Sequence, residues 1–264
     1  MRSLIDGAGG VGEAGLAMEF GSAFSYACKQ CGRCCRDKVI TLSPCDVIRI
    51  ARALRITTGE AISRYTIRRG SILRFDSDGR CIAAEGARCG IHRGRPLACR
   101  LYPLGIERAT DKIADARFVR LEPATGSAGV YGEAGTIADF LAAQEAGPCL
   151  ESIDAYAALL PRFGARVAQI VDYERVEPRE FWRVARREAL SETGYDPNPL
   201  IDAIFDADGC GCVRATLEAT FDAHIAALAR MIEANRDAGC VAAAAVMLAV
   251  SLGRSPADMG VAPG

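Results

Sequence analysis

A chain of 264 residues is long enough to bury a hydrophobic core and does not depend on disulfides to fold. It has 32 Lys and Arg against 33 Asp and Glu, and this formal net charge of −1 argues against a nucleic-acid-binding surface. Twelve cysteines leave two classes open, a secreted disulfide scaffold or an intracellular metal protein.

The first 24 residues are rich in Gly and Ala and lack periodicity, which predicts a flexible lead over residues 1–24. Asp6, Glu13 and Glu19 lie where a secretory signal would have a basic start and an apolar core. We therefore expect a cytoplasmic protein, in which clustered thiols indicate metal or redox chemistry. The stretch GAGGVG (Gly7–Gly12) formally fits a dinucleotide fingerprint, but no convincing strand precedes it.

The stretch YACKQCGRCCRDK brings four cysteines together. Cys28, Cys31 and Cys34 have C-x2-C-x2-C spacing, which lets a loop return successive sulfurs to one point, as in ferredoxin loops and, in part, zinc knuckles. Cys35 follows directly. Adjacent side chains in extended backbone point apart, so we expect either one spare cysteine, two metals or a cluster of several irons.

Two helices and a hairpin are predicted after this loop. Ser43 and Asp46 form a capping box before an amphipathic pattern that reaches residue 54, and residues 57–67 predict a second, shorter helix. Two short apolar runs flank Asp78–Gly79, a hairpin signal that places Cys81 at the start of the returning strand.

Cys81, Cys89 and Cys99 lie on a turn-rich stretch and suit ligands that return to the first loop. The fourth cysteine of a bacterial ferredoxin run would fall at Lys38, so that local pattern is excluded, and a remote Cys99 could replace it. The C-x3-C-x2-C triple of radical enzymes and the C-x-x-C-H haem motif do not occur in the sequence.

The other cysteines and His92 carry weaker signals. His92 could be a ligand, but a surface or supporting role is an equal alternative. Cys210 and Cys212 form a C-x-C pair that could bind metal, act as a redox pair or be ordinary small residues of a loop. Cys45 and Cys240 sit in helical patterns and are expected to be buried thiols.

The second half of the chain is predicted to be helical, with Pro161 interrupting one helix and His224 an ordinary helical residue. The apolar run from Cys240 to Leu252 is too short to span a bilayer and predicts a buried helix. The expected fold is mainly α, with an N-terminal cysteine-cluster region containing a small β-hairpin packed on a helical C-terminal half. The predicted divisions are a metal-binding region at 25–125, a helical region at 136–253 and a mobile tail at 254–264.

The segments CKQCGRCC and C…CGIHRGRPLACRLYP, separated by a helix, resemble the YkgJ-type CxxCxxCC family over residues 26–106. This family is described as zinc- or iron-chelating and includes flagellin lysine N-methylases. His92 departs from the tyrosine expected at its position, and Cys149 in AGPC is a further family-like cysteine. The resemblance implies these metal ligands: Cys28, Cys31, Cys34, Cys35, Cys81, Cys89 and Cys99.

Arg93, Arg95 and Arg100 surround the last of these cysteines. Their guanidinium groups could offset the negative charge of several thiolates, and would raise the potential of an iron–sulfur centre. Alternatively, they pair with surface acids. Pro96 and Pro103 are expected to stiffen the loop.

Thiolates with almost no histidine favour iron–sulfur or zinc. Because the thiols exceed the four that one zinc ion needs, we expect a [4Fe–4S] cluster, with zinc as the alternative. The expected function is a redox or metal-handling accessory protein with a protein or peptide partner, and without nucleic-acid or membrane binding. The alternatives are a protein-modifying enzyme related to flagellin lysine N-methylase and a structural zinc-binding domain. The sequence has no recognisable S-adenosylmethionine loop, which favours the accessory role.

Overall fold

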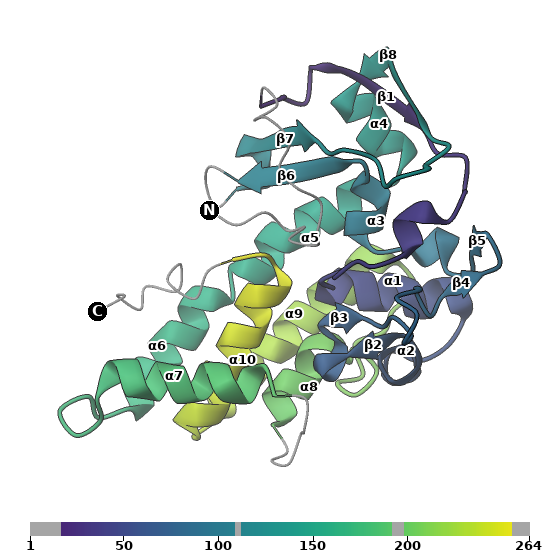
Figure 1. Cartoon of the computed structure of the whole chain (residues 1–264). Coiled ribbons are helices and arrows are strands. Elements are labelled where there is room, and N and C mark those ends of the chain that lie inside the picture. The colour runs from purple at the N-terminus through teal and green to yellow at the C-terminus, as the bar shows by residue number, and fades with distance from the viewer. Residues whose placement is uncertain (1–16, 109–111, 192–197, 255–264) are drawn as a thin grey trace.

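The computed structural model describes residues 17–108, 112–191 and 198–254 (Figure 1). The glycine-rich stretch Gly7–Gly12 and most of the predicted tail lie outside the described residues. The helices are α1 (Pro44–Leu54), α2 (Thr58–Tyr65), α3 (Leu97–Leu101), α4 (Ile137–Ala143), α5 (Gly147–Ala157), α6 (Leu160–Ile170), α7 (Pro178–Ala189), α8 (Pro199–Phe205), α9 (Leu217–Ala234) and α10 (Ala238–Ser251).

The strands form antiparallel pairs: β1 (Ala23–Ala27) with β8 (Val130–Thr136), β2 (Thr66–Ile67) with β3 (Ile72–Leu73), β4 (Ala84–Glu85) with β5 (Arg88–Cys89), and β6 (Leu104–Arg108) with β7 (Ala116–Arg120). Short 3-10 turns cover η1 (Arg33–Cys35), η2 (Arg68–Gly70), η3 (His92–Gly94) and η4 (Ile113–Asp115). The expected fold class, mainly α with small hairpins in the cysteine-rich region, is confirmed.

The helix-capping residues act as their sequence positions predict. Ser43 caps α1, and Asp46 completes a capping box with it. Thr57 caps α2 by accepting a hydrogen bond from the Glu60 amide. Pro161 separates α5 from α6 because it occupies the first turn of the second helix, where its missing N–H costs nothing.

The ribbon of β1 and β8 joins residues that are far apart in the sequence. Ala23 lies opposite Thr136 and Ala27 opposite Val130, so the strand that leads into Cys28 is paired with a strand 100 residues further along the chain. Phe24, on β1, is fully buried and packs edge-on against Phe140 of α4. The predicted division between residues 25–125 and 136–253 stays a prediction.

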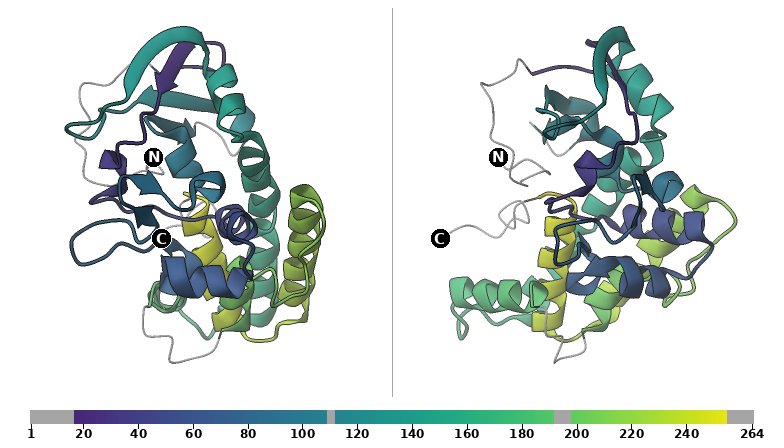
Figure 2. Two further views of the ribbon diagram at one scale, coloured as in Figure 1. Left: turned by 90° about the vertical axis from the view of Figure 1, so that its right-hand side faces the viewer. Right: turned by 45° about the vertical axis from the view of Figure 1, so that its right-hand side comes forward.

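Helix α10 lies among the helices of the C-terminal half and contacts α6, α7 and α8 (Figures 1 and 2). Its residues from Val241 to Ala249 are all buried, as the apolar sequence predicted. The many alanines let neighbouring helices approach closely, which explains burial on every side. In the described parts of the chain, no helix is long and apolar enough to cross a membrane.

Candidate metal centre

The first cysteine loop lies beside the turn predicted at Asp78–Gly79. The predicted hairpin is reduced there to an isolated bridge between Phe75 and Cys81, so Cys81 does not begin a strand. The amide of Cys81 donates a hydrogen bond to the carbonyl of Cys35 across 2.9 Å. The amide of Asp37 donates to the carbonyl of Gly79 across 2.8 Å, at the turn that the sequence placed there. These backbone contacts join two segments that are about 40 positions apart in the sequence. They therefore bring the cysteines around Cys35 close to Cys81.

Cys89 and Cys99 reach the same region from two further elements. Cys89 ends β5, where it lies opposite Ala84 of β4. Cys99 lies on α3, whose first amide, that of Leu97, donates to Asp46 of α1. Gly94 precedes this helix and packs so closely on α1 that a Cβ there would lie 2.6 Å from a carbonyl oxygen. The position of Cys99 is therefore fixed against α1.

Five thiols of this region influence one another electrostatically. Burial raises the pKa values of Cys81, Cys89 and Cys99, and negative charge on Cys34 raises each of the three further. Charge on Cys99 and Cys89 likewise adds to the raised pKa of Cys35. These five thiols are therefore close enough for the charge on one to affect the pKa of another.

The side chains of Cys34 and Cys35 interact with each other. The Cys35 thiol donates a hydrogen bond to the Cys34 sulfur, which lowers the pKa of Cys34 to about 7 and raises that of Cys35. Positive charge on Lys38 and Arg95 lowers the Cys34 pKa further. The expectation that the two side chains point apart is wrong, because residues 33–35 form a 3-10 turn after Gly32, whose φ is 72°, instead of extended backbone.

The two earliest cysteines lie at the edge of this group. Cys31 is half-buried and its sulfur accepts a hydrogen bond from the Ala128 amide across 3.5 Å, which lowers its pKa. Cys28 is exposed, and its sulfur accepts from the Gln30 amide across 3.4 Å. His92 is exposed, and its Nδ1 lies 3.3 Å from Nη1 of Arg95.

All seven cysteines that the resemblance implied as ligands are free thiols. Within residues 17–108, 112–191 and 198–254, no three His, Cys, Asp or Glu side chains already stand where they could hold one metal ion. Metal binding would thus require side-chain rearrangement and the loss of thiol protons. The donor set itself fits iron or zinc, because it consists of soft sulfur atoms. The ligand assignment stays a prediction.

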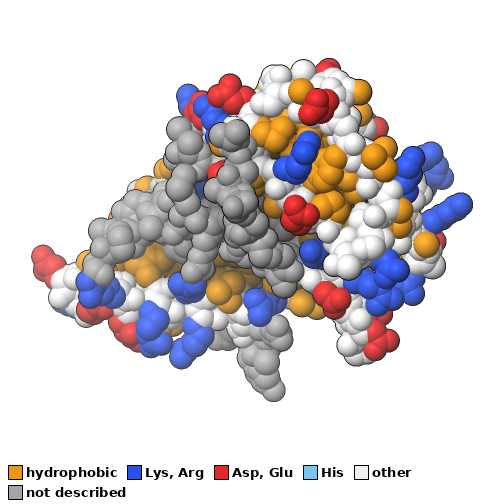
Figure 3. Space-filling model, turned by 45° about the horizontal axis from the view of Figure 1, so that its top comes forward, with side chains coloured by type: hydrophobic (Ala, Val, Ile, Leu, Met, Phe, Trp, Pro, Cys, Tyr) orange, Lys and Arg blue, Asp and Glu red, His pale blue; other side chains and the backbone are white. Residues whose placement is uncertain are grey.

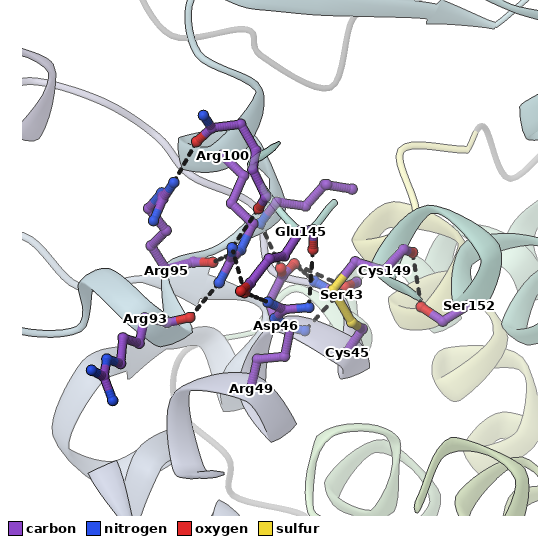
Figure 4. Close-up of a disulfide and its surroundings, with 12 residues drawn as sticks. Ser43, Cys45, Asp46, Arg49, Arg93, Arg95, Arg100, Glu145, Cys149 and Ser152 are labelled. Carbon is purple, nitrogen blue, oxygen red and sulfur yellow. Dashed lines mark hydrogen bonds and ion pairs between the residues drawn. A yellow bond between two sulfur atoms is a disulfide. The ribbon is translucent and has the colours of Figure 1, made fainter. Parts of the chain in front are cut away.

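Of the three arginines near Cys99, Arg100 has a structural role. Arg100 is 2% exposed and donates to the carbonyls of Arg95 at 3.0 Å, Gln144 at 2.5 Å and Arg93 (Figure 4). Its guanidinium also lies 3.6 Å from Glu145. Burial lowers its pKa to about 10. Arg100 therefore holds the loop before Cys99 onto the end of α4, and it is not the surface ion pair that one alternative expected.

Arg95 supports the other alternative. Its positive charge lowers the pKa values of Cys34 and Cys89, so it does offset thiolate charge. The wider sequence shows the same tendency, since residues 28–100 contain sixteen Lys and Arg but only six Asp and Glu. Several Lys and Arg side chains gather at the edge of the molecule that carries β4 and β5 (Figures 1 and 3). A positive surrounding stabilises a centre built from several thiolates.

The structure corrects the prediction for two other cysteines. Cys45 was expected to be a buried thiol and Cys149 a further family-like cysteine, but they form a disulfide with an S–S distance of 2.11 Å (Figure 4). It links α1 to α5 across 104 positions of sequence, a separation that gave no signal for pairing.

The remaining cysteines are the C-x-C pair, Cys210 and Cys212, and Cys240. Cys210 and Cys212 are also joined as a disulfide. Cys240 was expected to be a buried thiol, but it is half-buried. His224 is buried on α9, where the Tyr156 hydroxyl and a backbone carbonyl occupy its two ring nitrogens, so its ordinary structural role agrees with the sequence prediction.

Comparison with known proteins supports the metal-binding character of this region. Residues 27–117 match the CxxCxxCC family model, whose description is "Putative zinc- or iron-chelating domain". The resemblance seen in the sequence is confirmed over this segment.

The uncharacterized protein MJ0661 of Methanocaldococcus jannaschii is 31% identical to the chain over 96 residues. These residues are 35% of the chain and 52% of MJ0661, so the chain spans about half the length of that protein. No solved structure matches the chain.

Proposed function

We propose that the cysteine cluster binds an iron–sulfur centre, of the [4Fe–4S] type, and that the protein is a redox or metal-handling accessory protein. The observation that carries this proposal is the convergence of five thiols from three segments: η1, the turn into β4 and β5, and α3. The match to a zinc- or iron-chelating domain over the same residues supports it.

The residues that would hold the metal are Cys34, Cys35, Cys81, Cys89 and Cys99, with Cys31 and Cys28 at the edge of the group. A bound cluster supplies one-electron transfer, whereas zinc supplies only structural stability. Five convergent thiols exceed the four that one zinc ion takes, which favours iron–sulfur. The positive charges of Arg95 and Lys38 would stabilise the negatively charged thiolates at this half-buried site.

An accessory role requires a route by which a partner reaches the centre. Cys28 is exposed, and so are the neighbouring side chains of Lys29, Arg33 and Arg36. We propose that the partner is a protein with an acidic surface, because this rim is basic and would attract it. The cytoplasmic location belongs to the same proposal, since thiolate ligands must remain reduced to bind metal.

The test is to purify the protein without oxygen and to measure iron, acid-labile sulfide and zinc for each chain. We expect near-equal iron and sulfide, with a brown colour. Cys99→Ser should lose most of the metal, whereas Cys240→Ser, at a half-buried cysteine outside the group, should keep it. Stoichiometric zinc without sulfide would replace the cluster by a structural zinc site. Equal metal loss in both variants, or no metal in the wild type after reconstitution, would contradict the proposal.

A further inference from the structure

The loop that carries Cys210 and Cys212 joins α8 to α9 and is fixed at both ends to the cysteine-rich half. On one side, the Thr58 hydroxyl of α2 donates to Asp206 at 2.6 Å and to Asp208 at 2.7 Å. On the other side, the guanidinium of Arg52 donates to the carbonyls of Arg214 at 2.9 Å and Ala215 at 2.6 Å. Both ends of the loop are therefore held by contacts that do not involve its sulfurs.

The two sulfurs of this loop differ in accessibility. Cys210 is partly buried, whereas Cys212 is 2% exposed. Gly211, between them, is exposed and has a φ of 65°, and a Cβ at this glycine would meet no atom within 4 Å. Of the two cysteines, Cys210 is therefore the one that a small molecule in solvent reaches more readily.

The loop can accommodate the dithiol as well as the disulfide. The sulfur of Cys210 lies 3.4 Å from the carbonyl oxygen of Ala207, and that of Cys212 lies 3.4 Å from the carbonyl oxygen of Cys210. Each thiol formed by reduction would thus have an acceptor in place. The guanidinium of Arg214 donates to the Gly211 carbonyl across 2.6 Å, and positive charge beside a cysteine favours its thiolate.

We propose that Cys210 and Cys212 form a thiol–disulfide exchange site for low-molecular-weight thiols and their disulfides, with Cys210 as the attacked sulfur and Cys212 as the resolving sulfur. This site is separate from the seven cysteines of the candidate metal centre, and the proposal does not depend on the nature of the metal.

The exchange proceeds in two balanced steps. A thiolate RS⁻ attacks Cys210 Sγ, the bond between the two protein sulfurs breaks, and Cys212 leaves as a thiolate that takes up a proton. A second RS⁻ attacks the outer sulfur of the mixed disulfide, which forms RSSR and releases Cys210 as a thiolate. In sum, one protein disulfide and two RSH give one dithiol and one RSSR. The reverse reaction oxidises the dithiol at the expense of RSSR.

Glutathione in its two forms is the probe for this site. The reduced, folded variants Cys212→Ser and Cys210→Ser are treated with oxidised glutathione, quenched with acid and digested, and mass spectrometry locates the adducts. In Cys212→Ser we expect a stable glutathione adduct on Cys210, because no resolving thiol is present. In Cys210→Ser we expect Cys212 to react on the order of tenfold more slowly, because it is buried, and to react readily after denaturation.

The wild-type protein supplies a second measurement that does not rely on the folding of any variant. Reduced glutathione should open the Cys210–Cys212 disulfide in the folded protein and leave Cys45–Cys149 intact, because the latter pair is fully buried. Equal reaction of Cys210 and Cys212 in the two variants would overturn the assigned roles. A wild-type loop that stays unreactive toward glutathione in both oxidation states would overturn the exchange site altogether.

Discussion

The carboxylate of Asp46 accepts a hydrogen bond from the backbone amide of Leu97 across 2.7 Å. Asp46 lies in the first turn of α1, and Leu97 begins α3, which carries Cys99 two residues later. The same carboxylate accepts from the amide and the hydroxyl of Ser43, each at 2.8 Å, through its other oxygen. One fully buried group thus caps α1 and places the last predicted metal ligand.

Asp46→Asn should destabilise the fold. Both carboxylate oxygens accept hydrogen bonds, and asparagine would turn one acceptor into an NH2 group that faces a donor. We expect a loss of about 1–3 kcal/mol in the free energy of unfolding, measured by denaturant titration. Asp139→Asn is the matched control, because Asp139 is the exposed acid of the α4 capping box and accepts from Thr136 through one oxygen only. Equal losses in the two variants would show that the bond to Leu97 contributes nothing.

Arg100→Lys should also destabilise the protein, although the charge is conserved. A lysine ammonium cannot reach the carbonyls of Arg93, Arg95 and Gln144 together, and the carbonyls it misses would stay buried without a donor. We expect a loss of about 2–4 kcal/mol by denaturant titration. Arg93→Lys, at an exposed side chain of the same loop, should leave stability within about 0.5 kcal/mol of the wild type. A stable Arg100→Lys protein would mean that these carbonyls find other donors.

The stability of the protein should fall as the solution becomes acidic, and His224 should account for part of the fall. Burial lowers the pKa of His224 below its ordinary value of 6.5. The unfolded chain therefore binds a proton at a higher pH than the folded chain does, so stability is lost as pH falls below about 6.5. Tyr156 and Ala203 lie 2.7 Å from the two ring nitrogens, an arrangement that suits the neutral ring.

The measurement compares free energies of unfolding at about pH 7.5 and about pH 5 for the wild type and for His224→Gln. The difference between the two pH values should be larger in the wild type, because glutamine does not titrate. If the wild type and the variant lose the same amount of stability on acidification, the titration of His224 is not part of the cause.

Reduction of the Cys45–Cys149 disulfide should lower stability by about 2–4 kcal/mol, because the bond closes a loop of 104 positions and constrains the unfolded chain. The double variant Cys45→Ala/Cys149→Ala should show this loss without reductant and no further loss with it. Denaturant titration with and without dithiothreitol measures both effects. If reduction of the denatured Cys210→Ser/Cys212→Ser variant does not raise its free-thiol count, the Cys45–Cys149 bond does not form.

The sequence predicted elements with local signals and missed those without them. The capping residues Ser43 and Thr57 placed α1 and α2, and Pro161 placed the break between α5 and α6. Helix α8 was missed although its signals were present, since Asn198 caps it and Pro199 begins it. The strand pairs β1–β8 and β6–β7 were not predicted, because a two-stranded ribbon depends on a partner chosen by packing.

In the candidate site, too, the features with local sequence signals were predicted and the others were missed. The turn-rich sequence around Asp78–Gly79 indicated that the later cysteines return to the first loop, because a turn is a local signal. The spacing did not predict the hydrogen bond between Cys34 and Cys35, which depends on the turn that Gly32 permits. Nor did spacing reveal the partner of Cys45, since Cys149 lies on a distant helix and pairs through tertiary packing.

The family segment ends at residue 117, yet the bonds that hold its cysteine loops end beyond that point. Arg100 needs the Gln144 carbonyl, Cys45 needs Cys149, and the sulfur of Cys31 receives a bond from the amide of Ala128. A fragment excised at the family boundary would lose all three anchors at once. The smallest fragment that can fold alone and hold these thiols in place is thus longer than the segment matched by the family model.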